Sequence, residues 1–104
     1  MKPYRVKVQD GAWRELASEN AHWNLSLPRA QPDALIDLFH EALGHVAENP
    51  EIGPEDERHP GSGNRRLLLL AGQARRVGFW LYYFVDHEHE RIEVFAFEST
   101  HFDD

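Results

Sequence analysis

The chain has 104 residues, a formal net charge of −7 at neutral pH and a hydrophobic content of 41%. This length suits one domain, residues 1–104, and the hydrophobic fraction excludes a disordered chain. The acidic balance argues against non-specific nucleic-acid binding by the whole surface. Cysteine is absent, which excludes disulfides and thiolate metal sites, and no apolar run approaches the ~18 residues of a membrane helix. We therefore expect a cytoplasmic protein without a membrane segment.

The first residues predict a strand followed by a helix. Residues 4–8, YRVKV, alternate between apolar and basic side chains, as a half-buried strand does, with Arg5 and Lys7 on the solvent face. Asp10 is expected to cap the next helix, which should end at Pro28. The buried face of this helix is predicted to carry Trp13, Leu16, Ala17, Ala21 and Asn24/Leu27.

A second helix has the strongest periodicity in the chain. Pro32 and Asp33 suit its first turn, and Asn49-Pro50 should end it. Its predicted apolar stripe consists of Leu35, Leu38, Phe39, Ala42 and Val46, widened by Ile36 and Leu43.

Residues 50–63 are rich in proline, glycine and charge, so we expect a loop in which the acidic run 55–57 is solvated. Strands are predicted at 66–70, 76–85 and 92–97, separated by turns around Gly72 and at 86–90. The strand at 76–85 is apolar on both faces, which predicts a central place in the sheet with cover on both sides. The order β-α-α-β-β-β predicts an α+β fold, a helical hairpin packed on a small, mainly antiparallel sheet.

The histidines do not predict a metal site. His40 and His45 are five residues apart on a helix, so their rings diverge by roughly 140° and cannot share an ion. His87 and His89 lie on one side of a turn, but a third protein ligand is not evident. We predict no metal and no cofactor.

The usual catalytic motifs are also missing. The four serines lack the G-x-S-x-G context of a hydrolase nucleophile. The glycine-rich GSGN at 61–64 precedes a strand rather than a helix and lacks the lysine of a phosphate-binding loop.

Two arginine pairs remain, Arg65-Arg66 and Arg75-Arg76, at the ends of apolar strands. Together with Arg5 and Lys7 they would form a basic sheet face for phosphates or for the carboxylates of a partner. Arginines at strand ends also protect apolar strands from aggregation and pair with local carboxylates. Taken alone, the residues favour this second, structural interpretation.

The order of the motifs along the chain favours a binding role for these arginines instead. ALGHVAENPEIG closes the second helix with Pro50 and Gly53, and RRLLLL, RRVGFWLYYFVD and IEVFAFES follow in that order. This set, from Tyr4 to about Ser99, resembles the RelE/ParE superfamily of small bacterial type II toxins, and most of all its ParE-like, plasmid-stabilisation branch.

The resemblance implies a growth-inhibiting toxin that forms a hetero-oligomer with a cognate antitoxin, whose extended segment folds as it binds. ParE-like members bind and stall DNA gyrase without chemistry of their own, whereas RelE-like members cleave messenger RNA on the ribosome with basic residues at the scissile phosphate. Residue by residue, Arg66 and Arg76 match the arginines that open the second and third strands of many members.

The end of the last strand departs from the family pattern. Many relatives carry a histidine or arginine there and then a basic or tyrosine-bearing tail, whereas this chain has Glu98 and STHFDD. An acidic tail repels RNA phosphates, so we expect a toxin that binds antitoxin and a target such as gyrase. The residues expected to make these contacts are Arg5, Lys7, Arg65, Arg66, Arg75 and Arg76.

Two alternatives stay open. One is a ribosome-dependent mRNA endoribonuclease that uses Arg66, Arg76 and His101, the last as an acid–base group. The other is a non-toxic relative that acts as an antitoxin-bound binding module.

Overall fold

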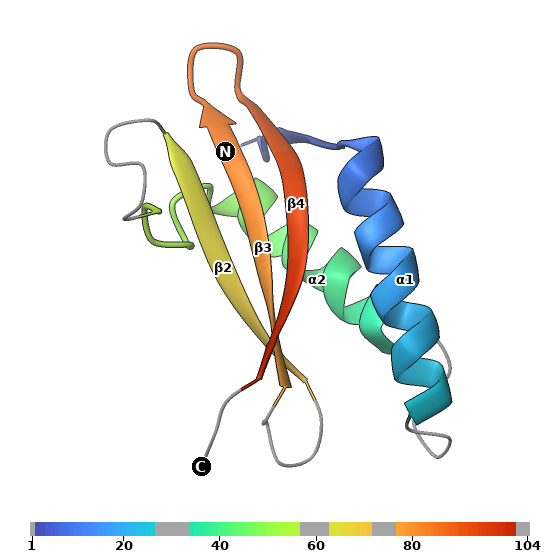
Figure 1. The fold of residues 1–104 in the computed structure, drawn as a ribbon. Coiled ribbons are helices and arrows are strands. Elements are labelled where there is room, and N and C mark those ends of the chain that lie inside the picture. The colour runs from blue at the N-terminus through green and yellow to red at the C-terminus, as the bar shows by residue number, and fades with distance from the viewer. Residues whose placement is uncertain (1, 27–33, 57–62, 72–76, 102–104) are drawn as a thin grey trace.

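The computed structural model describes residues 2–26, 34–56, 63–71 and 77–101 (Figure 1). The predicted helix stop at Pro28, the first-turn residues Pro32 and Asp33, and the turn around Gly72 lie outside these ranges. No described helix is both long enough and apolar enough to cross a membrane. In chain order the elements are β1 (Arg5–Val8), α1 (Asp10–Ser26), α2 (Ala34–Glu48), β2 (Asn64–Ala71), β3 (Val77–Asp86) and β4 (Arg91–His101).

The four strands form one sheet in the order β1-β4-β3-β2. The first strand runs parallel to β4, and the other neighbours are antiparallel. Both helices lie on the same face of this sheet (Figure 1). The predicted α+β class, the element order and the interior place of β3 are therefore confirmed.

The core forms where the stripe of α2 meets the helix-side residues of the strands. Phe39 of α2 contacts Phe97 of β4 edge-on at 5.5 Å between ring centroids, and Phe97 stacks on Phe79 of β3 at 5.3 Å. Each fully buried side chain of this size contributes about 1.5–3 kcal/mol through the removal of apolar surface from water. The predicted stripe of α2 is confirmed, with Leu35, Phe39, Ala42 and Val46 buried and Leu38 and Leu43 packed at the margin.

The predicted buried face of α1 is partly wrong. Ala12, Leu16 and Asn20 are buried, whereas Trp13 keeps 39% of its surface exposed. Ala17 and Ala21 are exposed as well. The three buried positions are spaced by four residues, so they lie on one face of the helix and pack against β4 and α2. Trp13 lies beside that face and contacts Phe39 at 5.5 Å from the rim of the core.

The start of α1 also differs from the prediction by one residue. The helix begins at Asp10, and the carbonyl of Gln9 accepts the hydrogen bond of the Trp13 amide at 3.1 Å. Gln9 is therefore the capping residue. Asp10 occupies the first turn, where its carboxylate favours the positive end of the helix dipole.

Two further expectations about burial are corrected. The acidic run 55–57 is not simply solvated, because Asp56 is only 2% exposed and its amide donates to the carbonyl of Asn64 at 2.9 Å. The second face of β3 is covered only in part: both helices pack on the opposite face, and Phe84 is 37% exposed, whereas Tyr82 is only 6% exposed. Neighbouring side chains of the sheet, rather than a second layer of helices, therefore give this face the cover that it has.

The hydroxyl of Tyr83 joins the segment after α2 to the sheet. This side chain is fully buried on β3, where its hydroxyl donates to the carbonyl of Pro50 and accepts from the amide of Gly53, both at 2.9 Å. A Cβ on Gly53 would lie 2.7 Å from this hydroxyl and 2.7 Å from the carbonyl oxygen of Arg66. Only glycine therefore fits between the loop and the strands.

We predict that Gly53→Ala lowers the free energy of unfolding by about 1–3 kcal/mol, because the added methyl group overpacks a backbone contact. Gly44→Ala is the matched control: it lies in α2 with open space around its Cβ position, and alanine should raise stability there by up to about 1 kcal/mol. Chemical denaturation of both variants measures the difference. Equal stabilities for the two variants would show that the Gly53 contact is not tight.

We predict a loss of stability in alkali that depends on Tyr83. Burial raises the pKa of Tyr83 above its ordinary value of 10.0, against the lowering effects of the Gly53 hydrogen bond and the Arg65 charge. The folded chain then holds this proton at pH values where the unfolded chain has lost it. The contribution is thus complete below pH 10 and declines as the pH rises from about 10 through the folded pKa. The free energy of unfolding, measured across this pH range, should fall less steeply in Tyr83→Phe than in the wild type.

Candidate functional site

The face of the sheet turned away from the helices is the main candidate surface. Side chains alternate between the two faces along a strand, and cross-strand partners share a face. Leu81, Tyr83 and Val94 are buried on the helix side. The register of the strands therefore identifies the residues on the opposite face. We call this surface the open sheet face. It comprises Arg5, Lys7, Arg66, Leu68, Trp80, Tyr82, Phe84, Glu93, Phe95 and Glu98.

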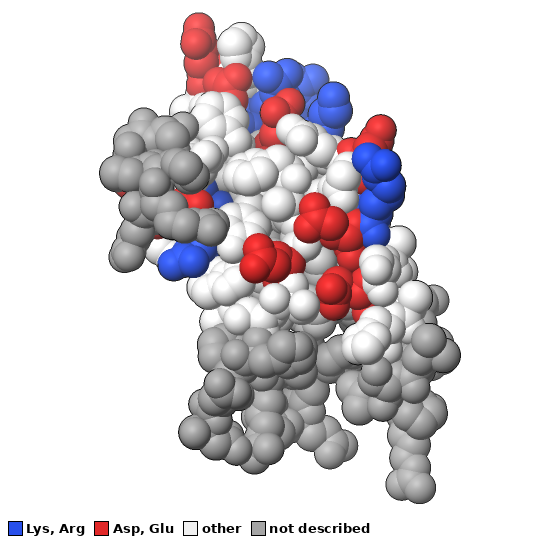
Figure 2. All heavy atoms as spheres, viewed as in Figure 1, with Lys and Arg blue, Asp and Glu red and all other residues white. Residues whose placement is uncertain are grey.

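Aromatic side chains form the centre of the open sheet face. Trp80, Tyr82 and Phe84 follow one another at alternate positions of β3, and the rings of Tyr82 and Phe95 lie 6.2 Å apart. A register shift between β3 and β4 at Tyr82/Tyr83 gives β4 an extra residue there. Figure 2 shows this face, with uncharged groups across its centre. Apolar surface of this kind, bordered by charges, is typical of a protein interface.

The adjacent arginines of β2 point to opposite faces. Arg66 lies over the ring of Trp80, with its guanidinium carbon 4.4 Å from the ring centroid. Arg65 lies on the helix side, where its Nη1 donates to the carbonyl of Gly53 at 2.9 Å and its Nη2 is 3.9 Å from a carboxylate oxygen of Glu51. The first arginine is thus displayed beside the aromatic patch, while the second holds the loop after α2.

The charges of the open sheet face are mixed. Arg5 and Lys7 belong to β1 at one edge and Arg66 to β2 at the other, and three strand spacings of about 4.8 Å separate the edges by roughly 14 Å. Glu93 and Glu98 of β4 lie between them. Acidic groups are visible among the uncharged ones, with basic groups towards the borders (Figure 2). In the described part of the chain, the expected basic residues therefore do not gather in one place.

The side chains of three predicted site residues lie outside the described part of the chain. Arg75 and Arg76 belong to residues 72–76, which lie outside the described part of the chain. His101 is the last residue of β4, in register with Val77, and its side chain is likewise outside the description. Their assignment stays a prediction.

The two histidines of the β3–β4 turn have different partners. The Nδ1 atom of His87 lies 2.9 Å from the hydroxyl of Tyr4, whereas the Nδ1 atom of His89 lies 2.7 Å from the Oδ2 atom of Asp86. The hydrogen bond from His89 is the main reason that the pKa of Asp86 is lowered. The two rings therefore do not form a histidine pair for a metal.

The sequence did not predict a second grouping of possible metal ligands at this turn, which includes Asp86 and leaves out His87. Ligand atoms of Asp86, Glu88 and His89 lie within 4.8 Å of one another. The carboxylate of Asp86 also accepts the His89 amide at 3.2 Å and lies 3.8 Å from Arg91. The contacts with His89 hold Asp86 in the hydrogen-bonded end of a tight turn.

Comparison with known proteins identifies the fold. No family model matches the sequence and no curated protein matches it. Among solved structures, the Mycobacterium tuberculosis RelBE2 toxin–antitoxin complex matches with a TM-score of 0.60 and 19% identity over 94% of this chain and 99% of that one. The intact Escherichia coli RelBE complex matches with a TM-score of 0.60 and 17% identity, covering 91% and 94% of the two chains.

A mutant of the E. coli toxin RelE in the free state matches as well, with a TM-score of 0.56, 15% identity and coverage of 92% and 82%. The chain therefore has the same fold as these RelE and RelBE structures. The resemblance stated from the motifs is confirmed at this level, and the ParE-like branch stays a prediction.

We predict that the twin arginines differ in their contribution to stability. Arg65→Ala removes a charged hydrogen bond to the Gly53 carbonyl from a side chain that is 24% exposed, and should cost about 1–2 kcal/mol. Arg66→Ala removes one contact with the face of Trp80 and should cost below about 1 kcal/mol. Urea denaturation of both variants provides the test, and a greater loss for Arg66→Ala would contradict the assigned roles.

Proposed function

We propose that this chain is the toxin component of a type II toxin–antitoxin system and is neutralised by a cognate antitoxin. The support is the fold, which it shares with RelE, together with two solved neighbours that are toxin–antitoxin complexes. The motif resemblance from Tyr4 to about Ser99 leads to the same proposal by a separate route.

The observation that carries the proposal is the open sheet face. Trp80 and Phe84 lie on it with Arg66 stacked at its edge, and tryptophan, tyrosine and arginine are the residues that contribute most to protein interfaces. An antitoxin segment that is disordered alone would gain affinity by laying apolar side chains on this patch. Its carboxylates would meet Arg66 in charge-assisted hydrogen bonds.

For the free toxin, we favour binding to a cellular target such as DNA gyrase. Glu93 and Glu98 lie within the open sheet face, where they would repel the phosphates of an RNA strand. The three tyrosines of the chain, Tyr4, Tyr82 and Tyr83, all precede β4. A tyrosine base or stacking platform beyond the last strand is therefore absent from this sequence.

Ribosome-dependent cleavage of messenger RNA is the second candidate. The RelE neighbours favour it, as does the position of Arg66 over an aromatic ring on which a base can stack. In this mechanism Arg66 and Arg76 would hold the scissile phosphate and His101 would transfer the proton.

We predict that tightly controlled induction of the chain alone arrests bacterial growth, and that co-expression of the antitoxin from the adjoining reading frame restores it. Arg66→Ala/Arg76→Ala should abolish the arrest because it removes two charged contacts to the target. Arg14→Ala is the matched control, an exposed arginine of α1 on the helix side of the molecule, and should leave the arrest unchanged.

The state of the arrested cells separates the candidates. Intact transcripts with DNA-damage signalling support gyrase as the target, whereas transcripts cleaved within codons support the ribonuclease. Absence of arrest by soluble, folded wild-type chain would contradict the toxin proposal and leave a non-toxic binding module.

A further inference from the structure

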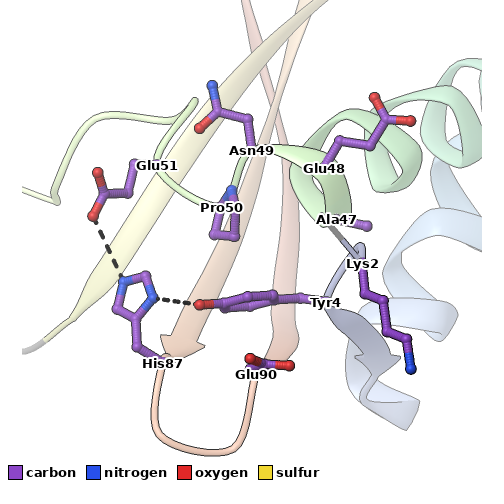
Figure 3. A pocket seen from close by; sticks show the side chains of 9 residues that line it. All are labelled: Lys2, Tyr4, Ala47, Glu48, Asn49, Pro50, Glu51, His87 and Glu90. Atoms are coloured by element: carbon purple, nitrogen blue, oxygen red, sulfur yellow. Dashed lines mark hydrogen bonds and ion pairs between the residues drawn. The ribbon is translucent and has the colours of Figure 1, made fainter.

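A second surface feature lies on the helix side of the sheet, away from the aromatic patch. It is a cavity of about 480 Å³ where three segments meet, namely the residues before β1, the end of α2 with its following loop, and the β3–β4 turn. Tyr4 extends across it towards His87 (Figure 3). We call this cavity the Tyr4 pocket.

The walls of the Tyr4 pocket are fixed by hydrogen bonds. The hydroxyl of Tyr4 lies 2.9 Å from Nδ1 of His87, and the two rings meet edge-on with centroids 5.7 Å apart. On the backbone, the Tyr4 amide donates to the carbonyl of Ala47 at 2.9 Å, and the Arg5 amide donates to that of Glu90 at 3.1 Å. All three segments are therefore tied to one another, and the pocket is preformed.

The lining favours a cationic ligand. Three carboxylates line the pocket, those of Glu48 and Glu51 from the end of α2 and its following loop and that of Glu90 from the β3–β4 turn, against one ammonium group from Lys2. Arg65, outside the lining, lies 3.9 Å from a carboxylate oxygen of Glu51. Figure 3 shows Glu51 on the far side of His87 from Tyr4, and its carboxylate lies 3.6 Å from Nε2 of that ring. An anionic group would be repelled here, whereas a guanidinium or ammonium group would be attracted.

The residue types in the lining indicate which kind of cation would bind. Tyr4 offers an aromatic ring, on which a guanidinium stacks favourably, and Asn49 adds a neutral amide beside it. A flexible arginine or lysine side chain would lie in this cavity with its aliphatic stem along Pro50 and its charged head among the carboxylates. The formal charge of −7 for the whole chain favours a partner that brings cations.

We propose that the Tyr4 pocket receives an arginine or lysine side chain of the antitoxin, as an anchor separate from the open sheet face. This inference rests on the proposed function, because it takes the antitoxin as the partner. The antitoxin would then be held at two places by opposite charges, with carboxylates at Arg66 and a cation at Tyr4. Two contacts of opposite sign on different sides of the sheet would fix its direction across the toxin.

The test is the affinity of the full-length chain for the antitoxin, measured by competition titration at low and high salt. Glu51→Gln/Glu90→Gln removes two of the carboxylates and should raise Kd by about tenfold at low salt, with a smaller difference at high salt. Lys2→Ala removes the competing ammonium group and should lower Kd by a few-fold. Glu88→Gln is the matched control, because it lies on the same turn and does not line the pocket.

The outcomes separate this inference from the proposed function. If the wild type binds the antitoxin and the double variant binds it equally well, the pocket assignment is overturned while the toxin proposal stands. If the wild type does not bind the antitoxin at all, both are overturned. Loss of folding in the double variant is detected by its unfolding curve, and Lys2→Ala then decides alone: unchanged or weaker binding overturns the assignment.

The partner residue can be found by a double-mutant cycle. Each basic residue of the antitoxin is changed to alanine and combined with Glu51→Gln. The proposed anchor is the residue whose loss is non-additive with Glu51→Gln. Additive losses for every basic residue would count against an antitoxin cation in the pocket.

Discussion

The buried hydroxyl of Tyr83 is the constraint on which the rest of the structure depends. It joins β3 to the loop after α2 by one donated and one accepted hydrogen bond. Gly53, whose amide donates one of them to the Tyr83 hydroxyl, has no room for a side chain, and its carbonyl accepts a hydrogen bond from the guanidinium of Arg65. The edge strand β2 is thereby held at its first half, since the Arg66 amide also donates to the carbonyl of Pro54.

The contacts around Tyr83 also determine on which face of the sheet the neighbouring charged side chains lie. With Arg65 committed to the loop, strand alternation places Arg66 on the opposite face, over Trp80 and open to a partner. The same loop carries Glu51, which reaches both Arg65 and His87 and so connects the Tyr83 contacts with the Tyr4 pocket. The proposed antitoxin surface therefore has an aromatic and cationic part on one face of the sheet and an acidic part on the other. The loop after α2 is connected with both parts, through Arg65 next to Arg66 and through Glu51 in the Tyr4 pocket.

Much of the fold could be predicted from the sequence because its elements have clear periodicity. The stripe of α2, the alternation of β1 and the interior place of β3 follow from local patterns of two and 3.6 residues. The failures occurred where a pattern was degenerate. Trp13 and Leu16 both fit a helical stripe, and only packing against β4 selects the face that carries Leu16. The apolar pattern of β3 predicts cover on both faces, but no helix covers the outer face and Phe84 is exposed there, because sequence alone does not distinguish a partly open apolar face from a buried one.

For the candidate site, the sequence by itself determined the residue types and the order of the motifs, including Arg66 beside an apolar strand and the Pro50, Gly53 and YYFVD signals. Only the tertiary structure decided which of these residues meet. Tyr83 and Gly53 are 30 positions apart and Tyr4 and His87 are 83 apart, yet each pair is in hydrogen-bond contact. Such contacts depend on the strand order β1-β4-β3-β2, which brings the first strand beside the last. Local periodicity specifies elements and their faces, whereas contacts between distant segments arise from how those elements pack.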